Sequence, residues 1–88
     1  DPYLLDILGL IYLKKGSLFM AKRFFDEAVD ISPRVGLFHY HLGLLYLRRD
    51  DKTSALKAFD QAIKLGLDKT HAESAQRFME KIDSEKGS

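Results

Sequence analysis

The strongest constraint on the fold of this chain is an internal repeat with a period of 34 residues. The stretch LGLIYLKKG at residues 8–16 returns as LGLLYLRRD at residues 42–50, with no insertion between the two copies. The agreement extends beyond these stretches, since Phe25 returns as Phe59 at the same offset. A fixed period of this length indicates a protein built from stacked copies of one small structural unit.

Each copy of the repeat has the pattern of two amphipathic helices. In the first copy, Leu5, Leu8 and Tyr12 are spaced by three and four residues, and Ala21, Phe25 and Ala28 in its second half by four and three. This spacing places apolar side chains on one face of a helix. We therefore expect helices over residues 2–15, 18–31, 34–49, 52–65 and 70–84.

Capping residues mark the expected helix ends. Asp1 and Ser32 each precede a proline, a combination that suits the start of a helix. Gly66 is placed to end the fourth helix. Thr70 and Glu73 have the spacing of a capping box that opens the fifth.

The expected fold class is all-α, an antiparallel array of helix hairpins with five helices. The connections between helices are only a few residues long, which favours antiparallel packing of neighbours. Gly9 and Gly43 lie inside expected helices, where glycine costs roughly 1 kcal/mol relative to alanine. We expect a close approach between helices at both glycines, because such an approach would offset that cost.

At these spacings the sequence resembles the tetratricopeptide repeat (TPR) family, an α-solenoid of helix hairpins. The first unit, residues 2–35, matches the family signature at Leu5, Leu8, Gly9, Tyr12, Ala21, Phe25, Ala28 and Pro33. The second unit, residues 36–69, matches at Leu42, Gly43, Tyr46, Ala55, Phe59 and Ala62 and departs at His39 and Leu67.

The resemblance covers essentially the whole chain and implies one domain. Residues 70–84 lack the signature and resemble the polar capping helix that closes such arrays, followed by a tail at residues 85–88. Because the sequence begins with Asp rather than Met, we expect a piece of a longer protein.

The residues give no support for an enzyme, a cofactor or a metal site. The chain has no cysteine, and His39 and His41, two residues apart, would point about 200° from each other on a helix. They therefore could not bind one metal ion together. We expect His39 to be a partly buried core residue and His41 to face solvent.

Charge and hydropathy restrict the class of partner. The 14 basic and 13 acidic residues are interspersed and give a net charge of +1, whereas nucleic-acid binding favours a clustered basic face. No apolar run approaches the roughly 18 residues that span a membrane. We therefore expect neither nucleic-acid binding nor membrane insertion.

The family resemblance implies a protein-binding scaffold in which the first helix of each hairpin lines a concave groove. Such a mostly apolar groove suits a protein or peptide partner that offers an amphipathic helix or an extended apolar segment. The carboxylate clamp by which some relatives hold chaperone tails is absent. In the alternative, packing against the capping helix fills the groove. The groove positions map to Tyr3, Asp6, Leu10, Leu13, Leu37, Tyr40, Leu44 and Leu47, with Ser74 and Phe78 added by the capping helix.

Two further surfaces are candidates for contacts. Lys14 and Arg48 recur with the period and form a candidate basic rim of the groove, or they compensate helix dipoles. Leu4 and Ile11 lie where a preceding repeat would pack, so they meet either further repeats or another subunit. The alternative function is therefore a structural self-association module, for example a homodimer.

Overall fold

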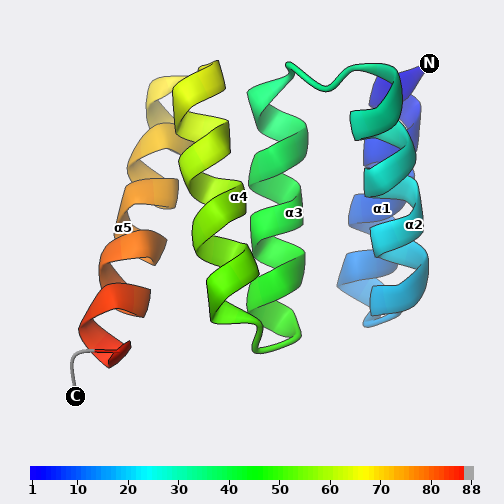
Figure 1. Cartoon of the computed structure of the whole chain (residues 1–88). Helices are drawn as coiled ribbons and strands as arrows, with labels where there is room; N and C mark the ends of the chain where they lie inside the picture. Colours follow the sequence, from blue (N-terminus) through cyan, green and yellow to red (C-terminus); the bar gives the residue numbers. More distant parts are fainter. Residues whose placement is uncertain (87–88) are drawn as a thin grey trace.

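The structure is a computed structural model that describes residues 1–86. Within these residues it contains five helices: α1 (Pro2–Lys15), α2 (Leu18–Ile31), α3 (Gly36–Arg48), α4 (Lys52–Leu65) and α5 (Lys69–Lys86). Consecutive helices run antiparallel, and the two hairpins and α5 follow one another in a row with the chain ends at opposite ends of it (Figure 1). The expected all-α hairpin array is confirmed.

Local sequence explains most of the helix ends. The carboxylate of Asp1 accepts a hydrogen bond from the backbone N–H of Tyr3 at 2.9 Å, as a residue before the first turn can. Gly16 ends α1 in the left-handed conformation, with φ of 85°. Its counterpart in the second hairpin, Asp50, adopts the same region with φ of 57°, and aspartate is one of the few other residues that tolerate it. Gly66 follows α4, as expected.

The predicted start of the third helix was wrong. Ser32 does not cap α3; its N–H donates to the carbonyl of Ala28 at 2.9 Å and so completes the end of α2. The next residues form a turn, and Nε2 of His39 donates to the carbonyl oxygen of Pro33 at 2.8 Å. Because Ser32 serves the preceding helix, α3 begins only at Gly36.

The predicted start of the fifth helix was also wrong. Asp68, not Thr70, lies before its first turn, and its carboxylate accepts a hydrogen bond from the N–H of His71 at 3.2 Å. At the other end, α5 continues through Lys86. Of the tail expected at residues 85–88, residues 87–88 lie outside the described residues.

Gly9 in α1 and Gly43 in α3 each lie at a close approach between the two helices of their hairpin. A Cβ atom added at Gly43 would lie 2.5 Å from the ring of Phe59, and one added at Gly9 would overlap the ring of Phe25 in the same way. Both rings are fully buried, so they have little room to move away. The expectation of a close helix–helix approach is confirmed.

The buried core of each hairpin extends into the helix that follows it. One buried cluster contains Phe25 of α2 and Leu45 of α3, and a second contains Phe59 of α4 and Ile82 of α5. Each hairpin is thus covered by the helix that follows it. This stacking places α1, α3 and α5, the first helices of the successive units, in a row.

Candidate functional site

The row formed by α1, α3 and α5 is held together by polar contacts. The two carboxylate oxygens of Asp6 lie 2.8 and 2.9 Å from Nδ1 of His41. The two side chains are only 5% and 8% exposed, respectively. The expectation that His41 faces solvent was therefore wrong: α1 packs over it, and the carboxylate of Asp6 supplies the partner that a buried imidazole requires. His39 is partly buried, as expected.

Tyr40 joins α3 to α5. Its hydroxyl donates to Oγ of Ser74 at 2.8 Å. Its ring, which is buried, lies 5.6 Å from that of Phe59 and 5.1 Å from that of His71. The Tyr40 side chain is therefore part of the packing between α3, α4 and α5. It is not part of the surface that a ligand could contact.

Not all the predicted groove residues are accessible. Like Asp6 and Tyr40, Leu13 is buried. Tyr3 is exposed, and its ring meets the edge of Phe38 at 5.1 Å. The half-buried members, which keep part of their surface available to a ligand, are Leu10, Leu37, Leu44, Leu47 and Phe78.

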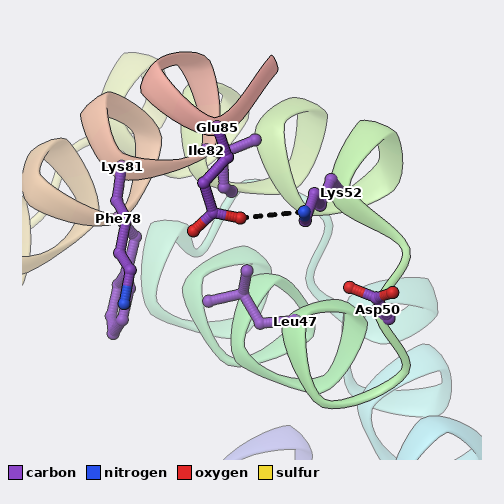
Figure 2. Close-up of a pocket in the computed structure, with 7 residues that line it drawn as sticks. All are labelled: Leu47, Asp50, Lys52, Phe78, Lys81, Ile82 and Glu85. Carbon is purple, nitrogen blue, oxygen red and sulfur yellow. Dashed lines mark ion pairs between the residues drawn. The ribbon is translucent and has the colours of Figure 1, made fainter. Parts of the chain in front are cut away.

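A hollow beside Leu47 and Phe78 lies between α3 and α5. It is a cavity of about 280 Å³ lined by Leu47, Asp50, Lys52, Phe78, Lys81, Ile82 and Glu85. Its apolar lining residues, which we call the apolar base, are Leu47, Phe78 and Ile82. An ion pair of 2.8 Å between Lys52 and Glu85 joins the start of α4 to the end of α5 beside the cavity (Figure 2).

Sequence reasoning identified Leu47 and Phe78 but missed the charged residues of this cavity. Asp50 belongs to the turn between α3 and α4, whereas Lys81 and Glu85 belong to the last turns of α5. Only the packing of α5 against the hairpin brings these segments together. In the sequence, these charged residues are marked only by their position at the ends of expected helices. Charged residues are common at helix ends, so this position does not indicate a site.

The ion pair beside the cavity makes the stability of the fold sensitive to pH. A hydrogen bond from Lys52, and then its charge, lower the pKa of the Glu85 carboxyl below its ordinary value of 4.5. The same bond raises the pKa of Lys52 above 10.5. Because the pKa of the Glu85 carboxyl is lowered, the ion pair stabilises the folded state at a pH above the ordinary pKa of the carboxyl, and this contribution is lost as the pH falls through the folded-state pKa. Because the pKa of Lys52 is raised, its contribution is lost as the pH rises through the raised pKa.

We therefore expect the melting temperature of the unchanged chain to be lower at about pH 3 than at about pH 6. We expect the melting temperature of Glu85→Gln to decrease less over the same change of pH. Circular dichroism melts at both pH values measure this difference. Asp51 and Asp68 also have lowered pKa values, through hydrogen bonds from Ser54 and His71 respectively, so some acid sensitivity remains in the variant. An identical fall in the melting temperature of Glu85→Gln would show that the ion pair contributes nothing to the stability of the fold.

The candidate basic rim is only partly free. Lys14 is exposed at the end of α1. Nη1 of Arg48 lies 3.3 Å from the carbonyl oxygen of Leu13, to which it donates. Arg48 therefore adds a second hydrogen bond to a carbonyl at the end of α1 that already accepts one from the N–H of Gly16. Leu4 and Ile11, the candidate repeat or subunit interface, are both exposed on α1.

Over residues 1–86, there is no cluster of three or more histidine, cysteine, aspartate or glutamate residues that could hold a metal ion. Among the helices of the same segment, none has the length and apolar character needed to cross a membrane.

Comparisons with known proteins agree with the repeat pattern. The family model of the tetratricopeptide repeat matches residues 3–35 and 38–65. A solution NMR structure of a tetratricopeptide repeat domain protein from Salinibacter ruber is similar, with 26% identity and a TM-score of 0.81; the match covers 96% of this chain and 88% of that one. No curated protein matches the chain. The chain therefore belongs to the tetratricopeptide repeat family, as two repeats followed by a further helix.

Proposed function

We propose that this domain is a protein-interaction module that binds an apolar peptide or helix of another protein along α3 and α5. Tetratricopeptide repeats are generally protein-interaction modules, and their fold is typically that of a non-catalytic scaffold. The observation that carries the proposal is the cavity between α3 and α5, which has an apolar base formed by Leu47, Phe78 and Ile82.

The surface beside the cavity favours a peptide over a small-molecule ligand. The cavity volume of about 280 Å³ lies at the lower end of the range of roughly 300–1,000 Å³ typical of small-molecule sites, so the volume alone does not separate the two. Leu37 and Leu44, half-buried on α3, extend the apolar surface away from the cavity. A ligand that anchors one apolar side chain in the cavity would continue along these leucines, as a helix or an extended segment can.

The charges around the cavity favour a ligand with charged residues beside its anchor. Two lysines, Lys52 and Lys81, and two carboxylates, Asp50 and Glu85, surround the apolar base. Charges of both signs at a rim contribute more to the orientation and association rate of a ligand than to its affinity. The apolar anchor would therefore supply most of the binding free energy.

A displayed library of random linear peptides, selected on the immobilised domain, tests this proposal. We expect the selected peptides to share an apolar residue and to bind Leu47→Asp about 30-fold or more weakly, because a charge in the apolar base removes the anchor site. Phe19→Ser is the matched control, since Phe19 is 80% exposed on α2, away from this surface. Isothermal titration with a selected peptide measures both variants.

Equal affinity of the unchanged chain and Leu47→Asp for the selected peptides would refute the groove assignment. Tyr40→Ala is a poor probe for this purpose. The Tyr40 side chain is buried and bonded to Ser74, so its removal would disturb the packing of α5 as well as any binding.

A further inference from the structure

The outer side of α1 carries a row of exposed apolar side chains. Leu4, Ile7, Leu8 and Ile11 are 60%, 51%, 38% and 45% exposed. Their spacing of three and four residues places them on one face of the helix. We call these four residues the α1 stripe. A continuous apolar face of this kind on a soluble domain usually marks an interaction site.

The equivalent positions of the second repeat are covered by neighbouring helices. The residues 34 positions later on α3 are Phe38, His41, Leu42 and Leu45, and all four are buried. They are covered because α1 and α2 pack against α3. The same four positions are therefore interior in the second unit and bare in the first. Three of the four positions are apolar in both units. The fourth is Ile7 in α1 and His41, which pairs with Asp6, in α3.

We propose that the α1 stripe is the interface of a homodimer, in which α1 packs antiparallel against α1 of a second copy about a two-fold axis. All four residues of the α1 stripe are apolar, so the stripes of two copies can pack against each other without burying an unpaired polar group. A two-fold interface requires such self-complementarity, because the same surface of each subunit forms both sides of it. A head-to-tail contact with α5 fits less well, because the exposed side of α5 is polar, with Glu73, Gln76, Glu80 and Lys81 among its exposed residues.

Spacing along the stripe determines the register of this contact. If Leu4 lies opposite Ile11 of the partner subunit, then Ile7 lies opposite Leu8 of the partner subunit, and the two-fold axis passes between residues 7 and 8. Every member of the stripe then meets another member. The interface repeats the spacing of three and four residues that allows side chains of two helices to interdigitate.

Charges at the two ends of α1 favour the antiparallel arrangement. Asp1 precedes the helix, and Lys14 and Lys15 occupy its last turn. In the register above, Asp1 lies beside Lys14 of the partner subunit, and the two helix dipoles oppose each other. A parallel pair would instead bring the lysines of both copies together, and like charges at close range disfavour that alternative.

This interface is separate from the concave face. On α1, the groove positions Tyr3 and Leu10 lie roughly 100° around the helix from the centre of the stripe. A dimer formed through the stripe therefore leaves the cavity between α3 and α5 open in both subunits. The proposal does not depend on peptide binding, and either can fail without the other.

Light scattering coupled to size-exclusion chromatography, over concentrations from micromolar to near millimolar, tests for the dimer. We expect the molar mass to rise toward twice that of the chain, and Ile11→Asp to remain at the mass of one chain throughout. Because Ile11 is exposed, its replacement is expected to leave the far-ultraviolet circular dichroism unchanged. Phe19→Asp, at an exposed position of α2 outside the stripe, is expected to dimerise like the unchanged chain. A monomer at every concentration, or a dimer that Ile11→Asp leaves intact, would overturn the proposal.

Single cysteines test the register, since the chain has no cysteine of its own. Ile7→Cys is expected to form a disulfide-linked dimer on mild oxidation, because residue 7 lies next to the axis. Leu4→Cys alone is expected to remain unlinked, since its two copies would be about 10 Å apart along the helices, beyond the reach of a disulfide. A mixture of Leu4→Cys and Ile11→Cys is expected to give the mixed dimer. Linkage of Leu4→Cys to itself would overturn the antiparallel arrangement.

Discussion

Phe59→Ala is expected to lower the free energy of unfolding by about 3–5 kcal/mol, the usual cost of removing a buried aromatic ring. Phe59 is fully buried on α4. Its ring stacks on Phe78 of α5 at 5.3 Å and lies 5.6 Å from the ring of Tyr40 on α3. It also occupies the space that Gly43 leaves open. One side chain thus joins three helices, and its loss leaves a cavity that none of them can fill.

Urea denaturation followed by circular dichroism measures this loss. Because a small domain has a total stability of roughly 5–15 kcal/mol, the variant is expected to be only marginally folded. Phe19→Ala is the matched control: it is the same chemical change at a side chain that is 80% exposed, and it is expected to alter stability by less than about 0.5 kcal/mol. Similar losses in the two variants would contradict the packing described above.

Asp6→Ala is expected to cost about 1–3 kcal/mol, because it leaves the buried Nδ1 of His41 without its hydrogen-bond partner. The contact joins α1 to α3 at 2.8 Å, so its loss weakens the packing between the two hairpins as well as the local hydrogen bonding. Asp6→Leu combined with His41→Leu is expected to cost less than Asp6→Ala alone, since it removes both polar groups and retains apolar volume.

The control for this variant is an ion pair on the surface. Lys22 and Asp26 on α2 lie closer together, at 2.6 Å, but their side chains are 35% and 44% exposed. Water competes for both groups, so Asp26→Ala is expected to cost no more than about 1 kcal/mol. Equal small losses in the free energy of unfolding for Asp6→Ala and Asp26→Ala, measured by urea denaturation, would contradict the idea that burial strengthens the Asp6–His41 contact.

The sequence by itself determined the architecture of this protein. Helical spacing within each unit is a local property, and the offset of 34 residues that relates the units requires them to pack in the same way. The pairs Gly9 with Phe25 and Gly43 with Phe59 recur with that offset, so a close contact within each hairpin could be inferred before any coordinates were known. Helix ends were less certain, because a residue such as Ser32 can serve the helix before it or the one after it.

Only the tertiary structure decided which side chains of the first helices are available for binding. On a helix considered alone, Asp6 and Tyr40 belong to a concave face and His41 to solvent. When α1, α3 and α5 pack in a row, Asp6 and His41 become a buried pair, and Tyr40 donates to Ser74. The cavity beside Leu47 likewise forms from segments that are distant in the sequence. Helical periodicity predicts the direction of a side chain from its own helix, whereas burial depends on the side chains that neighbouring helices bring to it.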